Sequence, residues 1–278
     1  MTKPLLRWAG SKRRLLPELE QFWPHDALRY VEPFAGSACL FFALQPQTAL
    51  LSDTNSHLVR TYRTLSNDAA AVYARYLSLP STKEYYYSIR RNAFTTSDDV
   101  DASAHFLYLN RNCFNGLYRT NLRGEFNVPF SDNRNGRILP KDEFLLSAKT
   151  LSRAQIECVD FEDILLNHVR YGDFVYLDPP YAIRNSRAFT QYGPDTFGLD
   201  DLQRLKIALG RLDEIGVPFV LSYADCLEAR ECFSAWRHFA TTVQRNIAGF
   251  AAHRRKSGEI LFFGRNTVAA SVRGWPEA

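Results

Sequence analysis

In the segment DFVYLDPPYAIRNS, which begins at Asp173, an apolar run ends at an acidic residue. Two prolines and a tyrosine follow this acid directly. Adjacent prolines cannot donate ladder hydrogen bonds and enter helices poorly, so the chain should leave the sheet as a stiff, extended loop. Asp178 is then expected at the carboxyl end of a strand, where open α/β sheets bind ligands. A carboxylate, a bare carbonyl and the Tyr181 ring would be held together there. The alternative is an ordinary loop that Asp178 starts and in which Tyr181 only packs.

A second group of chemically capable residues lies upstream, in VEPFAGSACLFF and LLSDTN. Gly36 follows a strand that carries Glu32, so the backbone can approach a ligand closely there. Asp53 ends the next strand, close to the spacing of roughly 20 residues at which an acid meets the ribose of an adenosine-type ligand. The G-x-G-x-x-G pattern of dinucleotide sites is absent, which favours a nucleoside without phosphates. S-adenosylmethionine fits, because its sulfonium cation suits a pocket with Glu32, Asp53 and Asp178. Asp53 has the alternative of capping the following helix.

Composition limits the class of protein. The 278 residues include 34 Lys and Arg against 30 Asp and Glu, a net charge of +4 that permits a polyanionic partner without requiring one. The five cysteines form no C-x-x-C pair, so we expect a reduced cytosolic setting and no structural zinc. No signal sequence and no apolar stretch near the roughly 20 residues of a membrane span is visible. We expect a soluble, cytoplasmic protein without a metal.

The elements that must position these residues follow an α/β pattern with an interruption. Periodicity predicts a helix from about Ser37, a helix at 199–215, two closing strands, and strands at 29–32, 49–52, 155–159, 173–177 and 217–223. From Asn55 to about Arg111 the pattern is helical, with a capping box at Ser81 and Glu84. A hairpin around LRGEF and a helix at 140–152 follow. The prediction is an α/β core of residues 1–55 and 146–278, split by a mostly helical insert of residues 56–145.

The order of the motifs is similar to that of the Dam-type DNA adenine N6-methyltransferases, the D12 class, group alpha. The resemblance spans nearly the whole chain and rests on W-A-G-x-K, V-E-P-F-x-G, S-D-x-N, NGLYRTNLRGEFNVPF and D-P-P-Y. D-P-P-Y alone is less specific, because glutamine and RNA methyltransferases carry variants such as N-P-P-Y. The resemblance implies a class I S-adenosylmethionine-dependent methyltransferase sheet and makes the insert the target-recognition domain.

For the cofactor, the resemblance assigns residues from five segments. They are Trp8, Ala9, Gly10, Lys12, Glu32, Phe34, Gly36, Asp53, Asp160, Phe161 and Asp178. Of these, Asp53 should hold the ribose, and Asp160 and Phe161 should meet the adenine ring. Asp160 has the alternative of capping a short helix.

The catalytic residues are expected to be Asp178, Pro179, Pro180 and Tyr181. The exocyclic amine of adenine is a poor nucleophile, because its lone pair is delocalised into the ring. The Asp178 carboxylate and the Pro179 carbonyl could accept its two hydrogens and aim the lone pair at the methyl group. The amine is out of reach inside a duplex, so the base must be flipped out, with Tyr181 stacked on it.

For DNA, the resemblance implies contacts from Arg7, Arg90, Arg111, Phe114, Asn115, Leu117, Arg119, Asn121, Asn127 and Pro129. Arg119 and Arg7 should contact guanines, Leu117 and Pro129 the thymines, and Phe114 should enter the gap that the flipped adenine leaves. Phe114 has the alternative of an aromatic in the core of the insert. Arg90, Arg111, Asn121 and Asn127 should touch phosphates.

The expected function is therefore methylation of adenine N6 in double-stranded DNA, with GATC as the leading target. SDNRNG after Phe130 departs from the family pattern, so Arg134 is a candidate for rebuilt outer contacts. The basic loop HRRKSG closes over DNA or is a solvated hairpin tip. Alternatives are another target sequence, an RNA or protein methyltransferase on the same core, and a DNA-binding regulator without catalysis. We expect a monomer, associated with the nucleoid through DNA, with a cognate restriction endonuclease as an open possibility.

Overall fold

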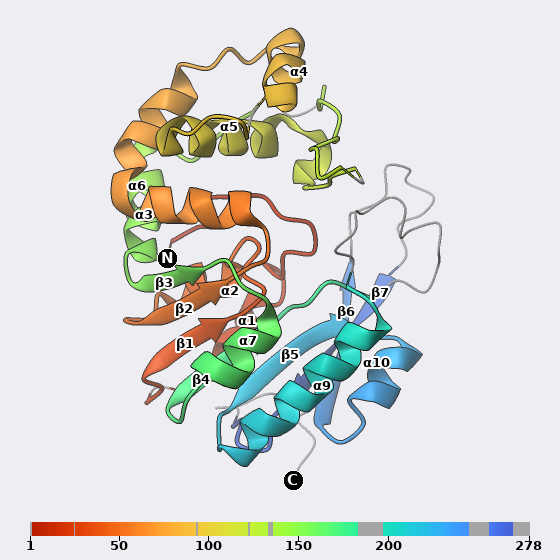
Figure 1. Ribbon diagram of the computed structural model, residues 1–278. Helices are drawn as coiled ribbons and strands as arrows, with labels where there is room; N and C mark the ends of the chain where they lie inside the picture. Colours follow the sequence, from red (N-terminus) through yellow and green to blue (C-terminus); the bar gives the residue numbers. More distant parts are fainter. Residues whose placement is uncertain are drawn as a thin grey trace.

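A computed structural model describes residues 2–24, 26–92, 94–121, 123–132, 136–182, 197–244 and 256–268. These residues contain one seven-stranded sheet in the order β3-β2-β1-β4-β5-β7-β6 (Figure 1). The strands are β1 (Arg29–Glu32), β2 (Ala49–Ser52), β3 (Ala154–Glu157), β4 (Asp173–Leu177), β5 (Phe219–Ala224), β6 (Arg237–Gln244) and β7 (Lys256–Phe263). β1 to β5 pair in parallel, and β7 lies antiparallel between β5 and β6. The predicted α/β class, with its class I methyltransferase sheet, is confirmed.

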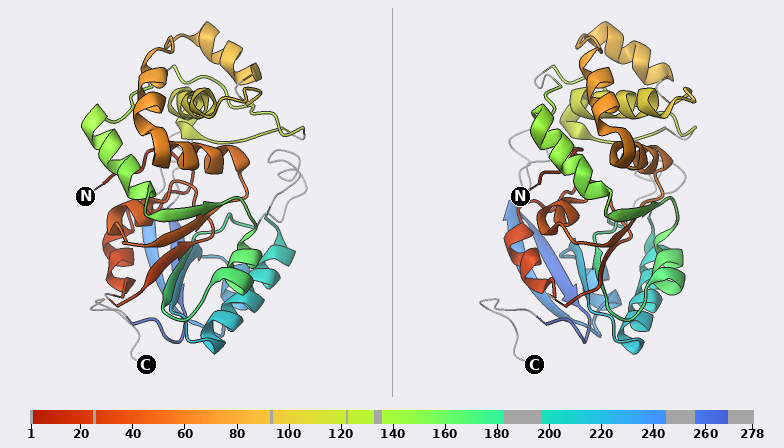
Figure 2. Two further views of the ribbon diagram at one scale, coloured as in Figure 1. Left: turned by 60° about the vertical axis from the view of Figure 1, so that its left-hand side comes forward. Right: turned by 90° about the vertical axis from the view of Figure 1, so that its left-hand side faces the viewer.

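The central strands are buried on both faces, which explains their nearly continuous apolar sequence. Successive side chains of a strand alternate between faces. Tyr30, Phe174 and Tyr176 therefore join one hydrophobic cluster, and Val31 and Val175 join the other. The first cluster includes residues of α1 (Leu16–Leu19), η1 (Glu20–Phe22) and α2 (Cys39–Leu44). The second includes residues of α7 (Phe161–Asp163), η3 (Ile164–His168), α9 (Leu199–Glu214) and α10 (Leu227–Cys232). Figure 2 shows helices on either side of the sheet.

A helical layer stands above the β2 and β3 side of the sheet (Figure 1). It contains α3 (Ser56–Leu77), α4 (Lys83–Asn92), α5 (Asp99–Asn112), η2 (Phe114–Gly116) and α6 (Lys141–Leu151). α3 bends at Asp68, whose φ of −140° is not helical, and the Asp68 carboxylate accepts a hydrogen bond from the Ala71 backbone N–H at 3.3 Å. The helices expected in the insert are present. The domain boundary stays a prediction, and its position at residue 146 falls inside α6.

Two local expectations in the insert need adjustment. The helix after Pro80 is capped by Thr82, whose hydroxyl accepts from the Tyr85 backbone N–H at 3.2 Å. The Ser81 hydroxyl instead donates to Asn112 at 3.5 Å. The predicted capping box of Ser81 and Glu84 is therefore wrong, and the helix cap lies one position later. The hairpin is held by isolated bridges rather than full strands, including one between Thr120 and Phe126.

Candidate functional site

Asp178 follows β4 directly, at the carboxyl end of the sheet, as the sequence predicted. The Lys12 ammonium donates to its Oδ1, and the Ser222 hydroxyl donates to the same oxygen at 3.1 Å. Lys12 Nζ also lies 3.2 Å from Glu259 Oε1 and 3.4 Å from the Tyr181 hydroxyl. The Lys12 side chain is only 6% exposed and that of Asp178 is 20% exposed. Four segments far apart in the sequence thus meet around one buried ammonium.

The charges in this cluster support each other. Burial lowers the pKa of Lys12, but the charges of Asp178, Tyr181 and Glu259 outweigh it and raise that pKa above its ordinary value. Lys12 is therefore a cation at neutral pH. Burial raises the pKa of Asp178, and the Lys12 charge and hydrogen bond oppose that rise. The carboxylate of Asp178 consequently depends on Lys12 to stay ionised.

The Tyr181 ring is fixed at both its edge and its hydroxyl. Tyr223 contacts it edge-on, with ring centroids 5.1 Å apart and planes at 74°. The hydroxyl donates to Glu259 Oε1 at 3.0 Å. Within the loop, Pro179 is buried and Pro180 is exposed. A carboxylate and a ring therefore stand side by side on the rigid segment that the sequence predicted.

Gly36 and Asp53 meet at the ends of β1 and β2. The Gly36 backbone has a φ of +45° and donates its N–H to Asp53 Oδ2 at 3.0 Å. Asp53 Oδ1 accepts from the Asn55 N–H at 2.9 Å. Asn55, not Asp53, caps α3, because its side chain accepts from His57 and Leu58 at 3.1 Å. The alternative in which Asp53 caps that helix is therefore wrong.

Three carboxyl groups, those of Glu32, Asp53 and Asp178, lie close together at this edge. Burial raises the pKa of Glu32 well above its ordinary value, and the charges of Asp178 and Asp53 raise it further, although the Tyr30 hydroxyl donates to Glu32 at 3.0 Å. Burial also raises the pKa of Asp53. A cation bound among these groups would relieve their repulsion. The residues present thus fit a positively charged ligand such as a sulfonium.

Trp8 connects the Gly36 turn to the hairpin. A Cβ built on Gly36 would lie 2.8 Å from Trp8 Cδ1, so the indole ring packs directly on this glycine. The same ring stacks on Tyr118, with centroids 5.7 Å apart and planes at 17°. Ala9 is exposed beside it, and Gly10 has a φ of +83° and offers its carbonyl to Lys12 at 3.2 Å. The predicted W-A-G-x-K residues therefore border both the sheet edge and the insert.

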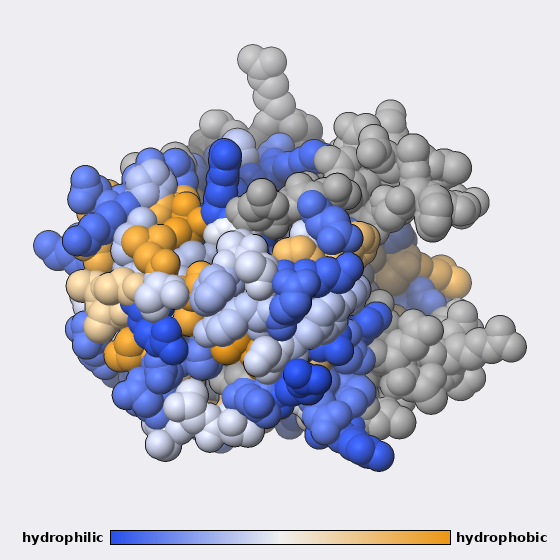
Figure 3. Space-filling view, turned by 90° about the horizontal axis from the view of Figure 1, so that it is seen from above, coloured by the Kyte–Doolittle hydropathy of each residue, from blue (hydrophilic) through white to orange (hydrophobic). Residues whose placement is uncertain are grey.

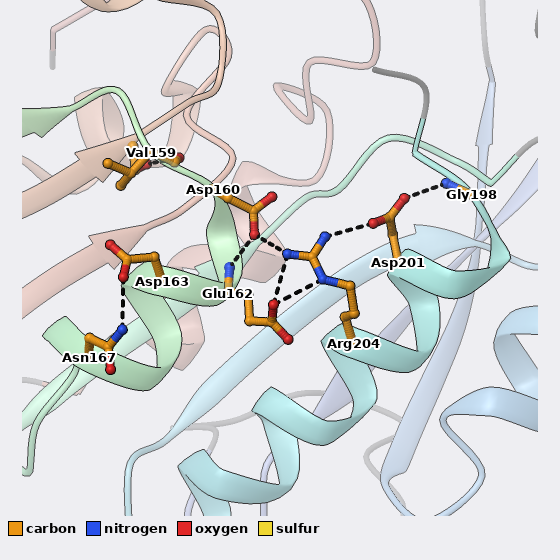
Figure 4. A network of polar contacts seen from close by, with 9 residues as sticks. Val159, Asp160, Glu162, Asp163, Asn167, Gly198, Asp201 and Arg204 are labelled. Carbon is orange, nitrogen blue, oxygen red and sulfur yellow. Dashed lines mark hydrogen bonds and ion pairs between the residues drawn. The ribbon is translucent and has the colours of Figure 1, made fainter. Parts of the chain in front are cut away.

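Asp160 lies in a network of polar contacts centred on Arg204 of α9 (Figure 4). Asp160 Oδ1 accepts from the Glu162 N–H at 2.9 Å, so Asp160 caps the short helix α7. Arg204 donates to the same oxygen at 2.5 Å and to Glu162 Oε2 at 2.9 Å. Its guanidinium lies 4.8 Å from the centroid of the Phe161 ring, on which Phe34 also stacks at 5.1 Å. The alternative in which Asp160 caps a short helix is confirmed, and the contact of Asp160 and Phe161 with adenine stays a prediction.

The hairpin presents some predicted DNA contacts on its surface. Phe114 is 42% exposed, and Asn115 and Pro129 are exposed too. The Phe114 N–H donates to the Pro129 carbonyl at 2.9 Å, so these residues lie side by side. Asn115 has a φ of +56°, which Asn adopts more readily than most residues. Because Phe114 is exposed, its alternative as a core aromatic of the insert is wrong.

Within the hairpin, side chains pair across the turn. Arg119 Nε donates to Asn127 Oδ1 at 2.7 Å, and Asn121 donates to Glu125 at 2.7 Å. Leu117 is partly buried. These bonds orient Arg119 before any ligand arrives.

Three of the predicted DNA-contacting arginines take part in internal structure. Arg90 donates to the Val128 carbonyl at 3.2 Å. Arg111 is 8% exposed and donates to the Leu5 carbonyl; burial and the nearby Arg7 lower its pKa to about 10. Arg7 donates to the Arg111 carbonyl at 3.3 Å. To contact a phosphate, the guanidinium of Arg90 or Arg111 would have to give up its hydrogen bond to a backbone carbonyl. That role stays a prediction.

Sequence reasoning missed four residues of this site: Ser222, Tyr223, Glu259 and Arg204. A signal existed for Glu259, which is the only acid in the apolar run EILFF. Arg134 lies outside the described residues, as do residues 253–255 of the basic loop HRRKSG, whose last three residues open β7. Among the residues that the structure does describe, no group of three His, Cys, Asp or Glu is placed to hold a metal ion, and no helix is long and apolar enough to cross a membrane.

Seen from above, the helical layer presents a largely hydrophilic surface where it is described, with hydrophobic residues gathered at the left of the view (Figure 3).

Comparison with known proteins decides the family. The family model described as D12 class N6 adenine-specific DNA methyltransferase matches residues 8–247. The chain belongs to this family. It is 31% identical over 268 residues to the type II methyltransferase M1.LlaDCHI of Lactococcus lactis subsp. cremoris, covering 93% of this chain and 94% of the relative. It is 35% identical over 242 residues to the type II methyltransferase M.MjaIII of Methanocaldococcus jannaschii, with 79% and 83% covered.

A third relative is a DNA adenine methylase of Escherichia coli strain K12, 32% identical over 264 residues, with 93% of this chain and 94% of the relative covered. The protein is thus an adenine-specific DNA methyltransferase of the D12 class, and DNA is its substrate. A reaction of this kind requires a methyl donor of the S-adenosylmethionine type.

Proposed function

We propose that this D12-class enzyme transfers the methyl group of S-adenosylmethionine to the N6 amine of an adenine flipped out of duplex DNA, and that its target sequence is GATC. The observation that carries the proposal is the junction of Asp178, Lys12 and Tyr181 on the loop after β4. This loop leaves the sheet beside β1, the strand that leads to Gly36. Donor site and base site would then share one edge of the sheet.

The loop would have to activate a weak nucleophile, the exocyclic amine of adenine. Asp178 would accept one N6 hydrogen and the Pro179 carbonyl the other, which frees the lone pair for attack. Lys12 and Ser222 support this role, since both hold Asp178 Oδ1 before a substrate binds. Preorganised acceptors of this kind cost no reorganisation at the moment of reaction. Tyr181 would stack on the extruded base, and Asp178 would take the proton that the methylated amine releases.

The donor site would lie among Gly36, Asp53 and Glu32. When bound, S-adenosylmethionine supplies an electrophilic methyl group on a cationic sulfur. The Gly36 turn supports this placement because its N–H orients the Asp53 carboxylate, and the buried carboxyl groups favour a cation. Asp53 would accept from the ribose hydroxyls, and Asp160 and Phe161 would contact the adenine ring.

The target assignment rests on the hairpin. Arg119, oriented by Asn127, is suited to contact guanine O6 and N7 bidentately. The exposed Phe114 would fill the space that the flipped adenine leaves, with Pro129 against a thymine methyl. The Escherichia coli relative named DNA adenine methylase agrees with methylation of adenine in DNA, although its name gives no target sequence.

Asp178→Ala tests the chemical part of the proposal. Transfer should fall by at least about 10²-fold, because the acceptor of the amine hydrogen is lost. Binding of S-adenosylmethionine, measured by calorimetry, should remain detectable. Asp142→Ala, which removes an exposed carboxylate on α6, is the matched control and should behave as wild type. Near-normal turnover of Asp178→Ala would sink the mechanism.

A further inference from the structure

A buried carboxylate has no role in the mechanism given so far. Glu259 lies in β7, between β5 and β6, and is 1% exposed. Its neighbours in the sheet register are Ala224 and Thr241, which carry no charge. A carboxylate in such a place is strongly unfavourable unless it is paired. Its partners therefore indicate what it does.

The polar contacts of Glu259 lead into the methyl-transfer site. The Tyr181 hydroxyl donates to its Oε1 at 3.0 Å, and Lys12 Nζ lies 3.2 Å from the same oxygen. Lys12 in turn donates to Asp178 Oδ1. One oxygen of Glu259 thus touches the ring that should stack on the base and the cation that holds the catalytic carboxylate.

We propose that Glu259 is a positioning residue for methyl transfer: it anchors the Tyr181 ring and gives Lys12 a second carboxylate, so that Asp178 is not locked to the ammonium. The inference rests on the proposed function of Asp178 and Tyr181. With Asp178 as its only partner, Lys12 would compete with the adenine amine for the carboxylate. Sharing the ammonium between two acceptors lets Asp178 turn toward the amine while Lys12 stays paired.

The charge of Glu259 should also affect which ligand the site prefers. One ammonium faces the two carboxylates of Asp178 and Glu259, so the cluster carries an excess negative charge. The reacting sulfonium must lie near this cluster, because the amine held by Asp178 has to reach the methyl group. In a buried site such charges interact far more strongly than in water. Glu259 should therefore favour a cationic ligand over a neutral one of the same shape.

Glu259→Gln tests this directly, because the amide keeps the volume and an acceptor for the Tyr181 hydroxyl and removes only the charge. The dissociation constants of S-adenosylmethionine, which is cationic, and S-adenosylhomocysteine, which is neutral at sulfur, are measured by calorimetry. We expect the first to rise about tenfold relative to the second, and single-turnover methylation to slow by about tenfold or more. Glu157→Gln, which removes a surface partner of Arg63, is the matched control and should leave both values unchanged.

Tyr181→Phe is the second variant, since it leaves every charge in place and removes only the hydroxyl. It should keep the ratio of the two dissociation constants. It should also alter the fluorescence of 2-aminopurine placed at the target adenine, which reports the environment of the flipped base. The two substitutions should be non-additive in methylation rate, because the Tyr181 hydroxyl contacts the carboxylate whose charge Glu259→Gln removes.

If Glu259→Gln raised the dissociation constants of both ligands equally, the inference would be overturned. Wild-type methylation rates in both variants would overturn it too. The proposed function fails separately, if the wild-type enzyme binds no S-adenosylmethionine or methylates no adenine.

Discussion

Replacing Gly36 by Ala perturbs the point where the sheet edge, the W-A-G-x-K segment and the hairpin meet. The new Cβ would lie 2.8 Å from Trp8 Cδ1, closer than real Cβ atoms approach, so the indole must move. The backbone φ of +45° is also strained for any residue with a side chain. Gly124 is the matched control, because its φ is +76° and a Cβ there meets nothing within 4 Å.

The expected loss in free energy of unfolding follows from separating the backbone strain from the contact with Trp8. A left-handed conformation costs a residue other than glycine roughly 1–2 kcal/mol, and both substitutions incur this cost. Both also gain a few tenths to about 1 kcal/mol from the lower entropy of the unfolded chain. Only Gly36→Ala displaces Trp8 from Tyr118, and an aromatic pair of this kind contributes about 0.5–1.5 kcal/mol. Gly36→Ala should therefore reduce the free energy of unfolding by about 0.5–1.5 kcal/mol more than Gly124→Ala does.

Urea unfolding of the two variants, followed by circular dichroism, measures this difference. In a Tyr118→Ala background the excess cost should vanish, because the stacking partner of Trp8 is already gone. Gly36→Ala should also weaken S-adenosylmethionine binding, whereas Gly124→Ala should not. Equal costs for the two glycines would refute the reasoning, since the Trp8 contact would then contribute nothing.

Two further substitutions test the charged cluster and the hairpin. Lys12→Met should reduce the free energy of unfolding by about 3–5 kcal/mol, because it leaves buried carboxylates without a cation. Burial already raises the pKa of Asp178, and without Lys12 it rises further. A raised acid pKa stabilises the fold below the ordinary value of about 4 and loses that effect as pH rises through the folded value. The deficit should thus grow as the pH rises above the ordinary value of about 4, and a constant deficit in urea midpoints would count against this. Arg119→Ala should lower discrimination at one guanine by about 1–3 kcal/mol in competition between substituted duplexes, whereas the exposed Arg123→Ala should leave the preference intact.

The sequence predicted the central strands well because their signals are local. β2 and β4 are short apolar runs bounded by turn residues, and both were predicted at their observed limits. The helix expected from Ser37 begins at Cys39, because Gly36 and Ala38 both have positive φ. The strand expected from Val217 begins at Phe219, after a proline that has no N–H for a ladder.

The site was predicted in part for the same reason. Motif residues at the ends of strands were expected to gather, and the structure brings Lys12 to Asp178 and Gly36 to Asp53. Pairings across long sequence separations left no local signal. Tyr181 and Glu259 are 78 residues apart, so neither spacing nor periodicity could join them. The same holds for Arg204, which α9 carries to Asp160 from 44 residues away.

The most direct test of the central claim is to incubate the purified enzyme with S-adenosylmethionine and unmethylated plasmid, then map N6-methyladenine by single-molecule sequencing. The account predicts methyl groups on the adenine of GATC and on no other sequence. Methylated adenine in a different sequence would contradict the assignment of Arg119 and its hairpin while leaving the chemistry of Asp178 in place. Absence of methylated adenine, with S-adenosylmethionine bound, would contradict the function itself.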